Sequence, residues 1–275
     1  MTRGCGWIFL IALGCSAPVE HEEQAKSSSG IVGGEAADPS SWPNVAWVNQ
    51  ACTGVVIGRS ALLTAAHCAP EGSIRLAEGS TRTLGHCSYM PQYELTEGKD
   101  LVVCEFFPPV EIEPATLITE AQRAAVEVGT EVTLLGYGVV RYQDADTEAG
   151  TLRRVSAPVV EIGDRELTIG GSNAGSCRGD SGGPAWLLTD QGYRLLGILS
   201  SGLSGMCGLG FYSDLNAHRE WIERTTPQEL SVAGGCSTAG RRGRSPASTL
   251  PPWAATAALL SAAYRRSRSR AARSR

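Results

Sequence analysis

The stretch Gly179-Asp180-Ser181-Gly182-Gly183-Pro184 places one serine in a turn that is built largely from glycines. Glycine permits sharp backbone turns and allows an amide to approach a neighbouring molecule closely. The N–H groups of Gly179 and Ser181 can therefore point at one spot beside the Ser181 hydroxyl. Donors that are preset where negative charge develops are worth about 3 to 4 kcal/mol each in acyl-transfer sites. We therefore take Ser181 as a candidate nucleophile, and Gly179 and Ser181 as a candidate oxyanion hole.

A histidine in a second stretch, Leu63-Thr64-Ala65-Ala66-His67-Cys68, could serve as the base for this serine. A serine hydroxyl is a poor nucleophile until an adjacent base removes its proton. An imidazole titrates near neutrality, so His67 can accept that proton and later return it. A third group must then fix the imidazole tautomer and stabilise the imidazolium.

The composition is that of a folded, all-β protein. Of the 275 residues, 42% are hydrophobic and 19% are charged, which is enough apolar content for one large core or two small ones. The 33 glycines and the many short Val/Ile/Leu runs that end in Gly, Pro, Ser or Asn predict short strands and tight turns. Long helical periodicity is almost absent.

Three stretches together resemble the chymotrypsin/trypsin family of serine proteases. Ile31-Val32-Gly33-Gly34 resembles the mature N-terminus of that family, and the His67 and Ser181 stretches resemble its histidine box and nucleophile loop. With its flanks, the resemblance covers most of residues 31–226. It implies two packed six-stranded antiparallel β-barrels, at about residues 31–122 and 123–213, with a C-terminal helix and an active site between the barrels.

The resemblance also implies a catalytic triad of His67, Asp100 and Ser181. Asp100 stands in Lys99-Asp100-Leu101-Val102-Val103, where the aspartate of the family precedes an apolar strand. Each match alone would favour a simpler interpretation, such as a core histidine, a solvated aspartate or one more residue of a Gly-rich turn. Their joint occurrence, in the order His, Asp, Ser and with matching cysteines, makes those interpretations improbable.

Asp180 is expected to control activation. A carboxylate beside the nucleophile would repel an oxyanion, so Asp180 should point away into a buried pocket and needs a cationic partner. The resemblance supplies one, the α-amino group of Ile31 that cleavage after Gly30 would release. Gly30 departs from the usual Arg or Lys at this position, so we expect an activating protease that is not trypsin-like, such as another bacterial protease.

Six of the nine cysteines lie between residues 31 and 226, without a CxxC motif or a Cys/His metal spacing. Three disulfides in an oxidising compartment are the simplest interpretation, and six free thiols are the alternative. The resemblance implies the pairs Cys52–Cys68 and Cys177–Cys207, which leaves Cys87 with Cys104. No metal or organic cofactor is implied.

The specificity pocket is expected to be open and uncharged. By resemblance, Gly175 forms its base next to Ser176, and Gly202 and Gly210 line its walls. No acid stands there to bind an Arg or Lys side chain, so trypsin-like cleavage is disfavoured. A large apolar or aromatic residue on the acyl side of the scissile bond is expected instead.

Charge is distributed unevenly along the chain. Residues 31–226 carry 13 basic and 24 acidic side chains, a balance of −11, whereas residues 241–275 contain nine Arg and no acid. The acidic domain should repel nucleic-acid phosphates. The basic tail could instead bind nucleic acid or anionic lipid independently of the domain.

The two ends of the chain predict export and surface attachment. Residues 1–15 have the basic start and apolar run of a signal peptide, and they also resemble a bacterial lipobox in which Cys15 would be acylated. Plain signal cleavage is the alternative. Residues 16–30 are polar and are expected to form a pro-segment.

The domain should close with a helix at residues 214–226, capped by Asp214. Residues 227–275 then contain a linker, Cys236, an apolar run from Leu250 to Tyr264 and six further Arg. This layout resembles the C-terminal sorting tags of myxobacterial surface proteins, with a disordered basic tail as the alternative.

These features predict an exported serine endopeptidase that is extracellular or attached to the cell surface or outer membrane. Its partners would be protein or peptide substrates and an activating protease, with membrane attachment through the termini. The alternative is a catalytically silent binding protein of the same fold. That alternative would be expected to lack a triad residue, and none is missing from the sequence.

Overall fold

The computed structural model describes Met1 and residues 31–68, 71–93, 98–139 and 149–226. The predicted signal peptide, lipobox and pro-segment lie outside these residues, and so do Cys236 and the predicted sorting tail. No helix in the described part of the chain is long and apolar enough to cross a bilayer.

The first barrel closes from six antiparallel strands, in the order β2-β3-β4-β7-β6-β5. Their bounds are β2 Val45–Val48, β3 Cys52–Gly58, β4 Ala61–Thr64, β5 Ser73–Leu76, β6 Thr81–Tyr89 and β7 Val102–Phe107. Val48, Leu62 and Phe106 are fully buried in its core. Closure leaves none of these strands with an unpaired edge.

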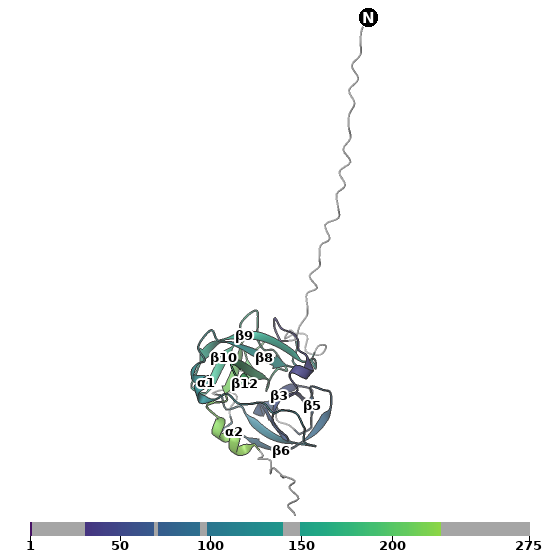
Figure 1. Ribbon diagram of the computed structural model, residues 1–275, viewed down its shortest axis with the longest axis vertical. Coiled ribbons are helices and arrows are strands. Elements are labelled where there is room, and N and C mark those ends of the chain that lie inside the picture. Colours follow the sequence, from purple (N-terminus) through teal and green to yellow (C-terminus); the bar gives the residue numbers. More distant parts are fainter. Residues whose placement is uncertain (2–30, 69–70, 94–97, 140–148, 227–275) are drawn as a thin grey trace, which may run out of the picture. The chain divides into compact units, whose positions relative to one another are not determined.

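The second barrel is formed by the six later strands. Their bounds are β8 Glu131–Gly136, β9 Arg153–Ile162, β10 Glu166–Ile169, β11 Pro184–Thr189, β12 Gly192–Gly202 and β13 Gly210–Asp214. They follow the order β9-β10-β13-β12-β11-β8, and a β8–β9 pairing closes the ring. Figure 1 shows the two groups of strands as separate halves of the domain. The predicted pair of six-stranded antiparallel barrels is confirmed.

A short strand near the N-terminus belongs to the second barrel. The strand β1 (Glu35–Ala36) pairs with β9, with Glu35 opposite Arg154, and the two side chains form an ion pair. This pairing departs from the predicted grouping of residues 31–122 with the first barrel. The pairing with β9 instead keeps residues near Ile31 beside the second barrel, where Ile31 joins the buried core.

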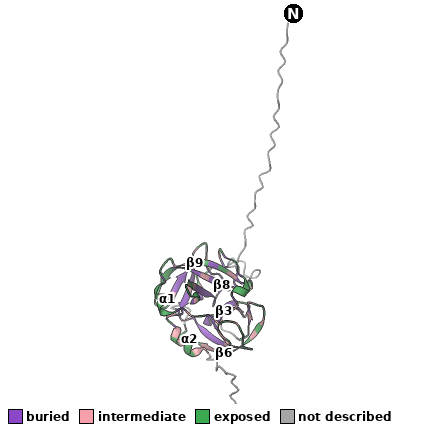
Figure 2. Cartoon of the chain, viewed as in Figure 1, coloured by how far each residue is buried: buried purple, intermediate pink, exposed green. Residues whose placement is uncertain are grey.

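A third hydrophobic cluster joins the two barrels. Val55 and Leu63 of the first barrel pack in one cluster with Leu135, Trp186 and Ile198 of the second. Figure 2 shows buried residues along the strands of both halves. Because this shared core fixes one barrel against the other, loops from both can meet at a single site.

The helical elements are short. They are η1 Pro39–Ser41, η2 Ala66–Cys68, α1 Glu120–Ala124 and α2 Arg219–Thr225. The C-terminal helix starts at Arg219 rather than at Asp214 as predicted, because Asp214 ends β13 and its carboxylate accepts bonds from the Asn216 N–H and the Arg123 side chain. Ile222 of α2 is buried in the cluster between the barrels.

Candidate active site

Two paired strands bring His67 and Asp100 together. His67 lies in η2, just after β4, and Asp100 lies just before β7. Because Thr64 pairs with Val102, the end of β4 and the start of β7 lie side by side. The Nδ1 atom of His67 is 2.6 Å from Oδ2 of Asp100, and the backbone N–H of His67 donates to Oδ1 at 2.9 Å.

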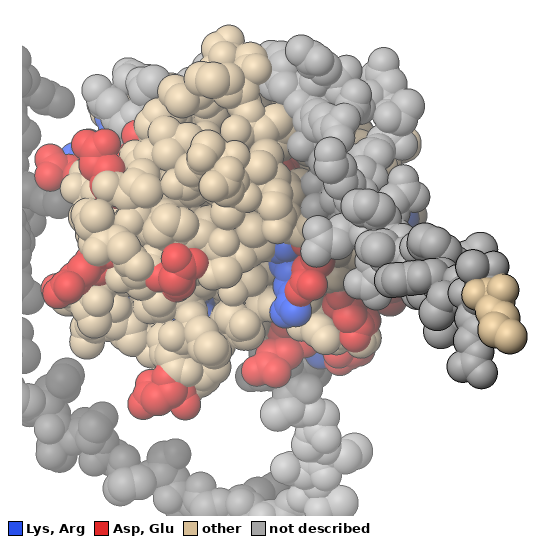
Figure 3. All heavy atoms as spheres, turned by 90° about the horizontal axis from the view of Figure 1, so that it is seen from above, with Lys and Arg blue, Asp and Glu red and all other residues tan. Residues whose placement is uncertain are grey.

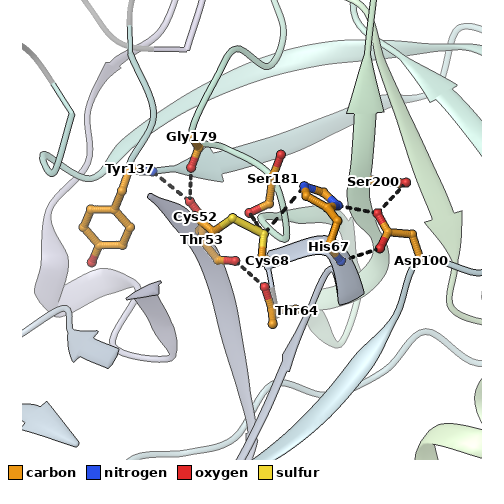
Figure 4. The surroundings of a disulfide bond; sticks show 10 residues. All are labelled: Cys52, Thr53, Thr64, His67, Cys68, Asp100, Tyr137, Gly179, Ser181 and Ser200. Atoms are coloured by element: carbon orange, nitrogen blue, oxygen red, sulfur yellow. Dashed lines mark hydrogen bonds and ion pairs between the residues drawn. A yellow bond between two sulfur atoms is a disulfide. The ribbon is translucent and has the colours of Figure 1, made fainter. Parts of the chain in front are cut away.

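Asp100 is wholly buried and is held by a third donor. The Ser200 hydroxyl of β12 donates to Oδ2 of Asp100 at 2.8 Å. Figure 4 shows Ser200 and His67 on opposite sides of the carboxylate. A carboxylate that accepts three hydrogen bonds is fixed in position, and it can orient the imidazole ring and hold its tautomer.

The turn with Ser181 is anchored to the first barrel by Thr53 of β3. The Thr53 N–H donates to the Ser181 carbonyl at 2.8 Å, and its hydroxyl donates to the Gly179 carbonyl at 3.1 Å. The same hydroxyl accepts the N–H of Tyr137 at 3.0 Å. Thr53 therefore connects the serine turn to both barrels (Figure 4).

The Cys52–Cys68 disulfide lies between the histidine and the serine turn. The Sγ atom of Cys68 is 3.6 Å from the carbonyl oxygen of Ser181 and 3.8 Å from Nε2 of His67. Figure 4 shows Ser181 near the imidazole, on the side of the ring away from Asp100. Within the described residues, no hydrogen bond joins the Ser181 hydroxyl to Nε2. Such catalytic bonds often form only when substrate is bound.

Two backbone donors lie next to the serine. Gly179 has a φ of +92°, and a Cβ there would come within 2.8 Å of the Gly138 backbone, so glycine is required. In the part of the chain that the structure describes, neither the Gly179 N–H nor the Ser181 N–H donates to a protein acceptor. Both donors can therefore bind an oxygen of a substrate.

Asp180 points away from this site and is buried. Its carboxylate accepts the Gly138 N–H at 2.8 Å and the Cys177 N–H at 2.7 Å. Burial raises the pKa of Asp180 to about 7, although these two bonds act in the opposite direction. No ion pair to Asp180 is formed within the described residues.

The residue that would supply a partner for Asp180 is also buried. Ile31 is 1% exposed and packs in the core of the second barrel, and the backbone of Val32 exchanges hydrogen bonds with Gly175. Ile31 has a φ of +57°, which is strained for a β-branched residue. Because φ is defined by the preceding carbonyl, cleavage before Ile31 would release this strain.

A cavity of about 310 Å³ opens beside Ser181. Its lining is mostly uncharged and comes from β12 and the two loops tied by the Cys177–Cys207 disulfide: Ser176, Cys177, Arg178, Ser181, Leu199, Ser201, Gly202, Leu203, Ser204 and Met206. Ser176 and Gly202 were expected in the specificity pocket. Gly175 and Gly210 were also expected there, but they support the lining rather than form it. A Cβ on Gly210 would lie 2.4 Å from Ser176 Oγ, and one on Gly175 would strike the Gly208 carbonyl.

The three disulfides within the described residues are Cys52–Cys68, Cys87–Cys104 and Cys177–Cys207, the pairs expected from sequence. Ligand atoms of Cys52, His67 and Cys68 lie within 4.8 Å of one another. Both sulfurs are in a disulfide, however, so this group offers no thiolate to bind a metal.

Thr53 and Ser200 support the site but were not predicted from the sequence. Both are buried polar residues in strands, and a buried hydroxyl needs a hydrogen-bond partner. This need for a partner is the signal that the sequence offers, but it does not say which residues the partners are. Their acceptors lie far away in sequence, Gly179 for Thr53 and Asp100 for Ser200.

Gly182 gives a direct test of how tightly the serine turn is packed. At a φ of +78°, a Cβ would lie 2.0 Å from Thr64 Oγ1 and 2.2 Å from the Thr53 carbonyl. We expect Gly182→Ala to lower the free energy of unfolding in urea by about 3 kcal/mol, the sum of backbone strain and overpacking. Gly192, at +92° with nothing within 4 Å, is the control, and Gly192→Ala should cost only about 1 kcal/mol of strain. Equal losses would contradict the packing described here.

An aspartate, a histidine and a serine in line, on two six-stranded barrels, form the arrangement of a serine hydrolase. The family model described as Trypsin matches residues 31–222, and the chain belongs to the trypsin family of serine endopeptidases.

Named relatives agree with this family. The chain is 29% identical over 255 residues to Serine protease 56 of Homo sapiens, covering 75% of this chain and 40% of that protein. It is 27% identical to Brachyurin of Leptuca pugilator, with 71% and 98% covered, and 28% identical to Trypsin of Phaedon cochleariae, with 71% and 88% covered. The match therefore spans less than half the length of Serine protease 56 but nearly all of Brachyurin.

Proposed function

We propose that this protein hydrolyses peptide bonds through an acyl-enzyme, with Ser181 as the nucleophile, His67 as the general base and Asp100 as the orienting carboxylate. The observation that supports this most strongly is the 2.6 Å contact between His67 Nδ1 and the buried Asp100. This contact keeps the proton on Nδ1 and leaves the lone pair of Nε2 on the Ser181 side.

The chemistry follows from these positions. Ser181 Oγ attacks the carbonyl carbon of the scissile bond while His67 Nε2 takes the hydroxyl proton, and the carbonyl oxygen becomes an oxyanion bound by the N–H groups of Gly179 and Ser181. The C–N bond then breaks as Nε2 returns the proton to the leaving amine. A water molecule then gives a proton to His67 Nε2 and attacks the carbonyl carbon of the ester. The bond to Ser181 Oγ breaks, and Nε2 returns the proton to Oγ.

We also propose that the protein is made as an inactive zymogen and is activated by cleavage between Gly30 and Ile31. Asp180 is buried without an ion-pair partner among the described residues, and Ile31 is already seated in the second barrel. Cleavage would convert the Ile31 amide into an ammonium group that can pair with Asp180. The oxyanion loop, which contains both Gly179 and Asp180, would then be fixed.

The proposed substrates have a large apolar or aromatic residue on the acyl side of the scissile bond. The cavity beside Ser181 has an apolar wall of Leu199, Leu203 and Met206, and none of the described residues that line it is acidic. A substrate Arg or Lys would therefore enter without a counter-charge. The proposed preference for apolar substrate residues therefore differs from that of an enzyme with an acidic residue in its pocket.

The proposed location is outside the cytoplasm, with attachment through the predicted terminal segments. The three disulfides suit an oxidising compartment. Several acidic groups lie on the face shown in Figure 3. Because these groups would repel phosphates, nucleic acid is not a proposed ligand of the folded domain.

Labelling by a fluorophosphonate probe tests the proposed function. The full-length chain, with residues 26–30 replaced by an enteropeptidase site so that cutting exposes Ile31, should be labelled after processing. The Ser181→Ala variant should not be labelled, because it lacks the nucleophile. A peptide library should then be cut after Phe, Tyr or Leu rather than Arg or Lys. If processed, folded protein stays unlabelled, the silent binding protein becomes the better explanation.

A further inference from the structure

Among the described residues, the charged side chain that lines the cavity beside Ser181 is that of Arg178, and it is basic. Arg178 lies between the disulfide-bonded Cys177 and Gly179, and its side chain is exposed. Its backbone carbonyl accepts the Val139 N–H at 2.8 Å. Across the described residues, the Arg178 guanidinium forms no ion pair with the protein.

The domain has an excess of acidic side chains, yet no carboxylate forms an ion pair with Arg178 within the described residues. Several other arginines each contact a carboxylate, namely Arg59, Arg123, Arg154, Arg219 and Arg224. Among the described residues Arg178 has no ion-pair partner, and it lines the cavity that a substrate would enter. A guanidinium has a fixed set of donors that match a carboxylate, so a substrate carboxylate is its natural partner.

We propose that Arg178 determines specificity by binding an acidic side chain of the substrate close to the scissile bond. The inference rests on the proposed function of this site. Arg178 directly precedes Gly179, whose N–H would bind the scissile carbonyl. Since an extended peptide advances about 3.4 Å per residue, the guanidinium can reach only about two residues on either side of that carbonyl.

The cavity itself can still accept an apolar residue. Leu199, Leu203 and Met206 supply the apolar wall, while Arg178 is exposed. An aromatic substrate side chain could also stack on the guanidinium, which would be a different use of Arg178. Stacking would not distinguish Glu from Gln at neighbouring positions, so the two uses give different results in the test.

The test compares matched peptides that differ at one position. Peptides with Phe at the cleaved position carry Glu, Gln or Lys at one of the two residues on either side. The protein, expressed at full length and then cut before Ile31, should cleave the best Glu peptide with a kcat/KM about fivefold above that of the matching Gln peptide. This is the size of effect expected of a partly exposed ion pair. The Lys peptide should be cleaved least well. The advantage of Glu should shrink in 1 M salt.

Two variants assign this preference to Arg178. In Arg178→Gln, the Glu-to-Gln ratio should fall to about one, and in Arg178→Glu the Lys peptide should become the best of the three. Arg194→Gln makes the same charge change outside this cavity and should keep the wild-type ratio.

The inference fails if the wild-type ratios are near one at all four positions, or if Arg178→Gln retains the Glu preference. Either result leaves the proposed function intact, because the peptides are still cleaved. A loss of aromatic preference in Arg178→Gln without any Glu effect would assign stacking instead. Absence of both cleavage and fluorophosphonate labelling would overturn the proposed function together with this inference.

Discussion

Replacing Asp100 with asparagine is expected to lower kcat by about 10⁴-fold at neutral pH, a typical loss for this substitution in a triad. Asn keeps an oxygen that can accept the backbone N–H of His67, but it presents an NH₂ group to Nδ1. His67 must then accept at Nδ1 and carry its proton on Nε2. In that tautomer, Nε2 cannot remove the proton of Ser181.

The matched control is Ser200→Ala, which removes one hydrogen bond to the same carboxylate but keeps its charge and both contacts to His67. One hydrogen bond is worth about 1 kcal/mol, so kcat should fall by about fivefold to tenfold. Urea midpoints for both variants would show that they fold. Equal losses of kcat in the two variants would mean that Asp100 acts as a structural residue and not through the tautomer of His67.

Much of the fold could be predicted because its signals are local. Short β-branched runs between glycines indicate strands, and the positive φ of Gly179 and Gly182 explains why the serine turn needs glycine. The two boxes around His67 and Ser181, with Asp100 before an apolar strand, identified the residues that the structure brings together.

The remaining features depend on contacts between distant parts of the chain. Thr53 bonds to a carbonyl 126 residues away, and Ser200 to a carboxylate 100 residues away. The pairing of β1 with the second barrel is also a long-range contact, and so are the contacts that place Gly175 and Gly210 behind the cavity lining. Local patterns do not contain this information, because it arises when the two barrels pack.

The second large effect concerns Asp180, because activation is proposed to require its pairing with the Ile31 amine. In the processed chain, Asp180→Asn should lower kcat/KM by about 10²- to 10⁴-fold, since losing one member of a buried ion pair costs about 3 to 5 kcal/mol. The uncut variant should match uncut wild type, because neither has the ion pair. Full activity of processed Asp180→Asn would contradict the proposed activation.

Stability against pH tests the same ion pair without measuring catalysis. In the uncut chain, burial raises the pKa of Asp180 to about 7, above its ordinary 3.8, so the folded state binds more protons than the unfolded state between these values. Its contribution should therefore decrease as pH rises from about 4 to 7, by up to about 4 kcal/mol. Pairing with the Ile31 ammonium would lower the pKa of Asp180 below its ordinary value, and the stabilisation would then be lost only as pH falls below about 4.

Urea unfolding of uncut and processed chains measures this change, in a Ser181→Ala background that prevents self-digestion. Subtracting the same data for Asp180→Asn removes the contributions of all other titrating groups. We expect a decrease in stability between pH 4 and 7 for the uncut chain and no decrease for the processed one. Cleavage releases residues 1–30 and leaves a new ammonium group on Ile31, and subtraction of the Asp180→Asn data restricts the comparison to charges that act on Asp180. Identical slopes would show that the new N-terminus lies elsewhere.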